Sequence, residues 1–325
     1  MRARTTAAAL ALLAAACGSG GGAGGGDRAG GRTTTTPVPT TTTAPPTTAP
    51  PTTAAPTTAT TAPVDPVTLR PPAVAGDPAG LAAQIGAAEA ALRTAGATET
   101  DVATAALAQQ AAYRVLGDHP EWDAAVVGAL PPELHGAVQA HAAARREFRA
   151  LGRRPATEMP TWRIVAPAPA ADLTAYYQEA EATFGVPWNV LAAINLVETG
   201  MGRIRGTSVA GAQGPMQFMP ATWAAYGEGD VNDPRQAILA AGRYLQANGA
   251  PGDMAGALWN YNHSDHYVRG VQLYADLIAE HPGAFAGFYH WGVWYWTTAG
   301  DLFLPVGYEA TEPVPADQYA ATTPR

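Results

Sequence analysis

One glutamate stands at the end of an otherwise apolar segment, in the stretch VETGMGRIRGTSVAGAQGPMQFMPATW between Val197 and Trp223. Counting back from Glu198 by four and then three positions reaches Ile194 and Leu191, so its side chain lies on the apolar stripe of the expected helix. Burial and the negative end of the helix dipole both disfavour a charged carboxylate, so we expect a raised pKa. A carboxylic acid that stays protonated near neutral pH is suited to general acid catalysis.

The alternative interpretation of Glu198 is a structural ion pair with Arg203, Arg205 or Arg243. An arginine partner would lower the pKa of the carboxylate, because opposite charge favours its ionised form. The segment that follows favours a functional site. It places glycines at positions 211 and 214, where the backbone is free to approach a ligand closely, and then Gln217, whose amide both donates and accepts hydrogen bonds.

Helix start and stop signals place Glu198 in an all-helical unit that spans residues 172–280. We expect Asp172 to cap a first helix that ends near Gly185, and Pro187 to open the helix that carries Glu198. The remaining start signals are Pro220 for a short helix to about Gly227, a capping box of Asp233 and Gln236, Asp253, and Ser264 or Asp265.

This unit resembles the lysozyme-like catalytic domain of bacterial lytic transglycosylases. The similar motifs, in the family's order, are VET, Ser208 followed by AGAQGPMQFMPATW, DPRQAILAAGRYL, and ALWNYN with HYV beyond it. The resemblance implies that Glu198 is the catalytic acid and base. It also implies that four residues contact the substrate or support the acid: Ser208, Gln217, Tyr261 and Asn262. Three more are candidates for lining the groove or packing beneath it: Met216, Phe218 and Tyr267.

Ordinary glycosidases use two carboxylates, but no clear second acid emerges from the sequence. Asp233 and Asp265 are expected helix caps, and Glu228 and Asp230 lie in a glycine-punctuated loop. One acid suffices where the substrate itself supplies the nucleophile. The resemblance implies a non-hydrolytic cleavage of peptidoglycan between N-acetylmuramic acid and N-acetylglucosamine, which leaves a 1,6-anhydro ring and needs no cofactor.

Two alternatives to this function stay open at the level of sequence. The first is a hydrolytic muramidase on the same fold, with Asp230 or another loop acid positioning water. The second is a non-catalytic peptidoglycan-binding or scaffold lipoprotein.

Other partners and sites find little support in the residues. The net charge of −8 and the lack of an arginine block interleaved with aromatic residues argue against nucleic acid. We expect no metal site, because His263 and His266 stand three apart without an HExxH motif or a cysteine ligand, and EGDVND is too short for a twelve-residue calcium loop. No GxSxG elbow is present either.

The N-terminal part of the chain has the sequence features of an export signal followed by a tether. Residues 1–17 resemble a bacterial lipoprotein signal, in which Cys17 is lipidated; an ordinary signal peptide with an incidental cysteine is the alternative. Residues 18–76 are rich in Gly and then in Thr and Pro, so we expect a disordered tether. The protein is therefore expected to act outside the cytoplasm, secreted or held at the outer face of the cytoplasmic membrane.

Two further segments flank the catalytic unit, so the fold class is mainly α with a short aromatic tail. Residues 77–152 have helical periodicity broken at GDHPEW and ALPPEL; we interpret them as an accessory segment with no identified partner among cell-wall synthesis or division proteins. Residues 153–171 are a Pro-rich connection. Residues 281–325 suggest a β-hairpin or extended cover around TAGD, from FAGFYH onward, with Trp291, Trp294 and Trp296 either lining a sugar site or simply packing.

Overall fold

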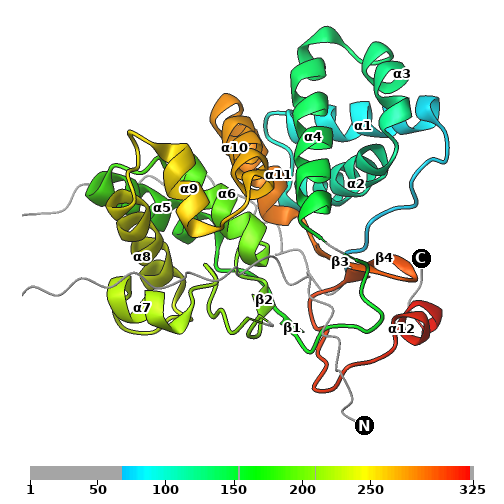
Figure 1. Ribbon diagram of the computed structural model, residues 1–325. Coiled ribbons are helices and arrows are strands. Elements are labelled where there is room, and N and C mark those ends of the chain that lie inside the picture. Colours follow the sequence, from blue (N-terminus) through cyan, green and yellow to red (C-terminus); the bar gives the residue numbers. More distant parts are fainter. Residues whose placement is uncertain (1–67, 153, 209, 323–325) are drawn as a thin grey trace, which may run out of the picture. The chain divides into compact units, whose positions relative to one another are not determined.

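The computed structural model describes residues 68–152, 154–208 and 210–322, and these residues are mainly helical (Figure 1). The mainly α fold class expected from the sequence is thus confirmed. The predicted signal segment, Cys17 and the tether up to residue 67 lie outside the described residues. None of the helices in the described ranges is long and apolar enough to cross a membrane.

Four helices form the accessory segment: α1 Pro78–Leu92, α2 Glu99–Asp118, α3 Asp123–Gly128 and α4 His135–Leu151. Short 3₁₀ turns, η1 Pro120–Trp122 and η2 Pro132–Leu134, fall at the two Pro-containing breaks expected from the sequence. The helices bury a small apolar core of their own, which includes Leu81, Ile85, Leu116, Val126 and Val138.

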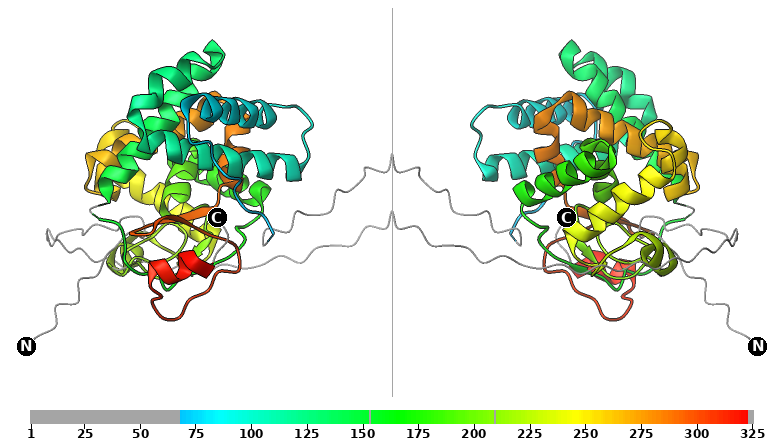
Figure 2. Two further views of the ribbon diagram at one scale, coloured as in Figure 1. Left: turned by 90° about the vertical axis from the view of Figure 1, so that its right-hand side faces the viewer. Right: turned by 90° about the vertical axis from the view of Figure 1, so that its left-hand side faces the viewer.

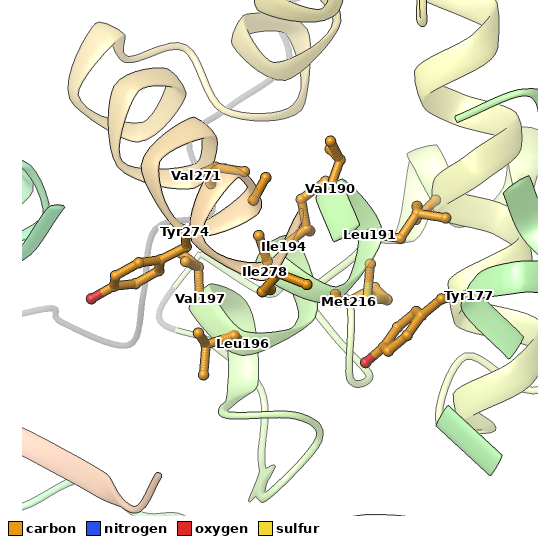
Figure 3. Close-up of a cluster of buried hydrophobic side chains, with 14 of the residues drawn as sticks. Tyr177, Val190, Leu191, Ile194, Leu196, Val197, Met216, Val271, Tyr274 and Ile278 are labelled. Carbon is orange, nitrogen blue, oxygen red and sulfur yellow. The ribbon is translucent and has the colours of Figure 1, made fainter. Parts of the chain in front are cut away.

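Six helices follow in the unit that carries Glu198: α5 Ala170–Phe184, α6 Trp188–Thr199, α7 Pro220–Tyr226, α8 Pro234–Ala247, α9 Met254–Tyr261 and α10 Asp265–Glu280. Helix α6 is buried along almost its whole length. Its apolar side chains meet those of α10 in the main core, where Ile194 and Val197 lie close to Val271 and Ile278 (Figure 3). The central position of α6 explains its continuous run of apolar residues.

Two of the expected helix starts differ in detail from the structure. Asp172 lies in the first turn of α5 rather than at its cap, because the helix begins earlier, after Pro169. The capping box of α8 is half formed: the Asp233 side chain accepts from the backbone N–H of Gln236 at 2.8 Å. The Gln236 side chain instead accepts from the backbone N–H of Asp230, which ties the preceding loop to the helix.

The tail contains the expected hairpin, made of β3 Val293–Thr297 and β4 Gly300–Leu304 in antiparallel register. The expectation was wrong for FAGFYH, which belongs to helix α11 Pro282–His290. Phe285 and Phe288 are three residues apart and both are buried in the main core, a helical spacing that the aromatic composition concealed. A second small sheet pairs β1 Arg163–Ile164 with β2 Ile204–Arg205, and α12 Ala316–Thr322 closes the described chain.

Helix α10 joins the accessory helices to the rest of the unit that carries Glu198. It packs against α4 on one side and against α6 and α9 on the other, while α11 packs against α2 (Figures 1 and 2). Ala106, Ala137 and Ala144 of the accessory helices belong to the same buried cluster as Ile194 of α6. The accessory helices therefore complete the core that supports the helix of Glu198.

Candidate functional site

Glu198 occupies the last turn of α6 and is buried, with 3% of its surface exposed. Its Oε1 accepts a hydrogen bond of 2.8 Å from the Tyr267 hydroxyl, and its Oε2 has no hydrogen-bond partner among the described residues. Burial raises the pKa of Glu198 well above the usual range of a glutamate, and the bond from Tyr267 opposes this only in part. The carboxyl group therefore keeps its proton to a higher pH than an ordinary glutamate does.

The alternative ion pair of Glu198 is not formed. Arg203 donates to the backbone oxygens of Gly200 and Tyr289, and Arg205 donates to that of Asn232. Arg243 donates to the Tyr226 carbonyl and pairs with Glu228. With these guanidinium groups engaged elsewhere, no cation offsets the burial of the carboxyl group within the described part of the chain.

Two tyrosines stand beside the buried acid. Tyr267, in the first turn of α10, is almost fully buried, and Tyr261, at the end of α9, lies with its ring nearly parallel to it at 6.4 Å between centroids. The Tyr261 hydroxyl donates to the Met216 carbonyl at 2.7 Å. Burial first, and then the proximity of Glu198, raise the pKa of both phenols, so both keep their protons and act as donors.

A tight loop of residues 213–218 carries Gln217. Gln213 and Phe218 exchange two backbone hydrogen bonds of 2.9 Å, which close the loop. Gln217 adopts a left-handed backbone conformation with φ of 52°, unusual for a residue other than glycine, and its Nε2 donates to the Gly214 carbonyl. One end of the Gln217 amide therefore stabilises its own loop.

The two glycines of this region differ in their surroundings. Gly214 has a φ of 73°, and a Cβ at this position would lie 2.0 Å from the Val231 carbonyl oxygen. The close approach at Gly214 is thus to another part of the chain and not to a ligand. Gly211 also has a positive φ, of 95°, but faces open space.

Two polar side chains of α6 hold the loop, and a third, from α5, orients one of them; the sequence motifs did not single them out. The Thr199 hydroxyl and the Asn195 amide both donate to the Pro215 carbonyl, at 2.6 and 2.9 Å. The Tyr177 hydroxyl donates to the Asn195 Oδ1 at 2.7 Å. Asn195 precedes Glu198 by three positions, so a second polar residue on the same apolar stripe was the signal available in the sequence.

The other residues implied by the resemblance are all buried. The Ser208 hydroxyl accepts from the backbone N–H of Ala212 at 3.0 Å and so shapes its own loop. Asn262 is fully buried directly after α9. Met216 and Phe218 are 0% and 3% exposed and pack in the main core, so they support the loop rather than line a surface.

No second carboxylate accompanies Glu198 among the described residues. The Asp230 side chain accepts from the backbone N–H of Asn232, and Asp233 caps α8. Glu228 is exposed and paired with Arg243. His266, considered above for metal binding, is paired with Glu147, and the described ranges contain no group of three or more His, Cys, Asp or Glu side chains arranged to hold a metal ion.

The tryptophans of the aromatic tail pack against other side chains, so their indole faces are not free to bind a sugar. Trp291 is buried, and its Nε1 donates to the Gln109 side chain at 2.9 Å. The guanidinium of Arg114 lies over the ring of Trp294, and that of Arg149 lies over the ring of Trp296. These contacts favour the packing interpretation of the tail over a sugar site.

Comparison with known proteins identifies one part of the chain. Residues 175–275, which include Glu198 and both tyrosines, match the family model of the transglycosylase SLT domain. The chain matches none of the curated proteins and none of the solved structures with which it was compared. The family match supports a lysozyme-like fold for this segment and, at the level of the family, lytic transglycosylase activity on peptidoglycan outside the cytoplasm.

Proposed function

We propose that this protein, whose residues 175–275 match the family model of the transglycosylase SLT domain, cleaves the β-1,4 bond between N-acetylmuramic acid and N-acetylglucosamine without water, with Glu198 as its one acid and base. The observation that carries the proposal is a buried carboxyl group with a raised pKa and no charged neighbour among the described residues. An acid of this kind is poised to give up a proton to a leaving group near neutral pH.

In the proposed reaction, protonated Glu198 donates its proton to the glycosidic oxygen while the bond from that oxygen to C1 breaks. The 2-acetamido group of the sugar stabilises the positive charge that develops at C1. Glu198, now ionised, removes the proton from the C6 hydroxyl, whose oxygen bonds to C1 and closes the 1,6-anhydro ring. The acid ends protonated, no water is consumed, and no cofactor takes part.

The two oxygens of Glu198 suit different tasks in this scheme. Oε1 accepts from Tyr267, which fixes the orientation of the carboxyl group, whereas the unpartnered Oε2 is the atom available for proton transfer. When the carboxylate forms during the reaction, the Tyr267 hydroxyl bond stabilises it, because a hydrogen bond to a charged acceptor is stronger than one to a neutral acceptor. Tyr267 is therefore proposed as a positioning residue.

A hydrolytic muramidase is less well supported, because Asp230 is exposed and engaged with Asn232 in its own loop. A purely binding function gives no reason to bury an unpaired carboxyl group, which costs free energy of folding.

Digestion of purified sacculi, followed by mass spectrometry of the products, tests the proposed reaction. We expect fragments with anhydro ends, 18 Da lighter (about the mass of one water, since none is consumed) than the products of hydrolysis. Glu198→Gln should lower the rate by about a thousandfold or more, since it keeps the shape of the side chain but has no acidic proton to transfer. Fragments with ordinary reducing ends would establish hydrolysis instead, and binding of sacculi without products would establish a binding module.

We further propose that the domain is held at the membrane by a lipid on Cys17, through the tether of residues 18–76. The support is the sequence pattern alone: a short apolar run that ends in Ala-Ala-Ala-Cys. Labelling of cells with a fatty-acid analogue should mark the wild-type protein and leave Cys17→Ser unmarked. Equal labelling of both forms would exclude an anchor at this residue.

A further inference from the structure

Arg203 is a buried cation in the turn that follows the helix of Glu198. Only 7% of its surface is exposed, and no carboxylate pairs with it in the described part of the chain. Arginine is almost never buried to this extent unless its charge is paired. Burial lowers the pKa of Arg203 to about 10, which still leaves the guanidinium charged at neutral pH. The proposed reaction gives this charge no role.

The ends of two helices take the place of an acid beside Arg203. Its Nη1 donates to the Gly200 carbonyl at 3.0 Å, and its Nη2 donates to the Tyr289 carbonyl at 2.5 Å. Gly200 is the C-terminal cap of α6, and Tyr289 lies in the last turn of α11. The carbonyls at the end of a helix lack partners within it and carry its partial negative charge, so a cation is stabilised there. One guanidinium thus caps two helices.

Arg203 also closes a turn with an unusual backbone. Gly200, Met201 and Gly202 have successive positive φ angles of 60°, 63° and 81°. A left-handed conformation is unfavourable for methionine, and it persists only where the surroundings hold it. The Thr199 hydroxyl accepts from the backbone N–H of Gly202 at 3.0 Å. The Arg203 side chain bonds back across the turn to Gly200, so side chains hold the left-handed segment from both of its ends.

This turn bears on the acid because Glu198 is the last residue but one of α6, which ends at Thr199. Helix ends are the parts of a helix that fray. Opening of this last turn would move the Glu198 carboxyl group away from the Tyr267 hydroxyl, which lies on α10 and reaches it by one hydrogen bond of 2.8 Å. A contact that keeps the turn closed therefore also keeps the acid in place.

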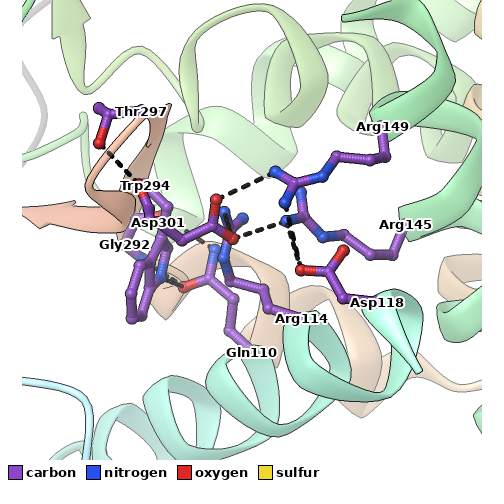
Figure 4. A network of polar contacts seen from close by, with 10 residues as sticks. Gln110, Arg114, Asp118, Arg145, Arg149, Gly292, Trp294, Thr297 and Asp301 are labelled. Atoms are coloured by element: carbon purple, nitrogen blue, oxygen red, sulfur yellow. Dashed lines mark hydrogen bonds and ion pairs between the residues drawn. The ribbon is translucent and has the colours of Figure 1, made fainter. Parts of the chain in front are cut away.

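The other end of the Arg203 contact is held by the accessory helices. Helix α11 packs against α2, and Gly292, just beyond α11, exchanges two hydrogen bonds of 2.9 Å with the Gln110 side chain of α2 (Figure 4). The guanidinium of Arg203 also lies over the Tyr289 ring, at 5.5 Å from its centroid. Arg203 thus bonds the end of α6 to a segment that is fixed independently of α6.

We propose that Arg203 is a positioning residue for the acid: its guanidinium ties the last turn of α6 to the end of α11 and so keeps Glu198 against Tyr267. The expected effect on turnover rests on the proposed function, whereas the effect on the placement of Glu198 does not. Arginine suits this task because its planar fork presents separate donors to two carbonyls. The ammonium group of lysine keeps the charge but lacks this fork.

Arg203→Lys, made in the purified full-length protein and assayed on soluble glycan strands, tests the effect on turnover. We expect kcat to fall about tenfold or more while KM changes by less than about twofold, because the acid is misplaced and the groove is intact. Arg205→Lys is the matched control, since Arg205 donates to the Asn232 carbonyl, in a loop rather than at the end of a helix. An unchanged kcat in Arg203→Lys, a loss that appears mainly in KM, or an equal loss in both variants contradicts the proposal.

A second measurement follows the placement of Glu198 and needs no activity. Tyr267→Phe removes the hydrogen bond to the acid, so its effect on the unfolding equilibrium reports whether the two side chains face each other. In the Arg203→Lys background, the factor by which Tyr267→Phe changes the unfolding constant should be about threefold or more smaller than in the wild type. In the Arg205→Lys background it should be unchanged. Equal factors in all three backgrounds would show that Arg203 stabilises the fold without positioning the acid.

These measurements separate this proposal from the proposed function. If the wild type leaves glycan strands uncleaved, the proposed function is wrong and the unfolding measurements still decide the role of Arg203. If the wild type cleaves them and the unfolding effects are additive, only the role of Arg203 is wrong.

A second pair of variants serves if Arg203→Lys does not fold. Tyr289→Leu removes the ring beneath the guanidinium and keeps the carbonyl, and Tyr289→Phe, which keeps the ring, is its control. Tyr267→Phe should then have a smaller effect on the unfolding constant in the Tyr289→Leu background than in the Tyr289→Phe background. The same effect in both backgrounds would overturn the proposal.

Discussion

At the scale of single residues, the proposed reaction depends on a carboxyl group whose burial costs free energy of folding. Glu198 is 3% exposed and receives one hydrogen bond, from Tyr267, while its second oxygen has no partner among the described residues. An ionised carboxylate in this position lacks the solvation that water would give it. The protein thus retains a group that lowers its stability at neutral pH, as sites adapted for function commonly do.

This cost gives a prediction about stability. The pKa of Glu198 is higher in the folded than in the unfolded protein, so the folded state holds a proton that the unfolded state has lost. The contribution of Glu198 to the free energy of unfolding is therefore most favourable below the unfolded pKa of about 4.3. It falls by up to about 1.4 kcal/mol per pH unit until pH reaches the folded pKa.

Glu198→Gln removes this titration, so the variant should gain stability relative to the wild type as pH rises from 4 to 8 (roughly from below the unfolded pKa to well above it). Urea unfolding of both proteins at several pH values measures the difference between their free energies of unfolding. A difference that stays constant with pH would mean that the carboxyl group titrates alike in the folded and unfolded states.

At the scale of elements, the loop of residues 213–218 is held between α6 and the segment before α8. Thr199 and Asn195 hold its Pro215 carbonyl, and Gly214 lies so close to the Val231 carbonyl that no side chain fits between them. The loop is therefore positioned by tertiary contacts on both sides. Its Met216 carbonyl in turn accepts from Tyr261, beside the acid.

Gly214→Ala should therefore lower the free energy of unfolding by about 3 kcal/mol, from a strained positive φ together with a clash against the backbone. Gly211→Ala is the matched control, since it has a positive φ but open space around it, and should cost about 1 kcal/mol. Thermal or chemical unfolding measures both. Equal losses would show that backbone strain alone, and not the contact with Val231, requires glycine at position 214.

At the scale of the whole molecule, the accessory helices and the unit that carries Glu198 are connected by ion pairs as well as by their shared core. Glu147 of α4 accepts from Arg269 at 2.9 and 3.0 Å and pairs with His266 at 2.6 Å. Both partners lie in the first turns of α10, on either side of Tyr267 in the sequence. The accessory segment thus fixes the end of the helix that supplies the donor to Glu198.

Glu147→Gln should reduce kcat by up to about tenfold with little change in KM, because a small shift of Tyr267 misaligns the acid. The cost in stability should stay below about 1 kcal/mol, since the pairs are partly exposed. Glu179→Gln is the control, as it breaks an exposed ion pair with Arg235 between α5 and α8. Turnover on soluble glycan strands measures kcat and KM of both variants. An equal reduction of kcat in both would contradict the inference that Glu147 acts by positioning Tyr267.

Several features were determined by the sequence alone, because they depend on local rules. Helical periodicity and the punctuation by Pro and Gly predicted most helices, and TAGD between aromatic runs predicted the hairpin. An acid on an apolar stripe predicted a buried Glu198 with a raised pKa. Local patterns failed at FAGFYH, where the packing of Phe285 and Phe288 in the core selected a helix over a strand.

Only the tertiary structure decided which side chains meet across long stretches of sequence. Tyr267 donates a hydrogen bond to Glu198 from a helix that lies 69 positions later in the sequence. Asp301 accepts hydrogen bonds from arginines of both α2 and α4. No periodicity encodes such contacts, since they arise from how helices stack and not from the spacing within them. A cavity of about 150 Å³ lined by Arg114, Leu196 and Trp294, among others, exists for the same reason: its walls come from both flanking segments and from the unit that carries Glu198, and only folding brings them together.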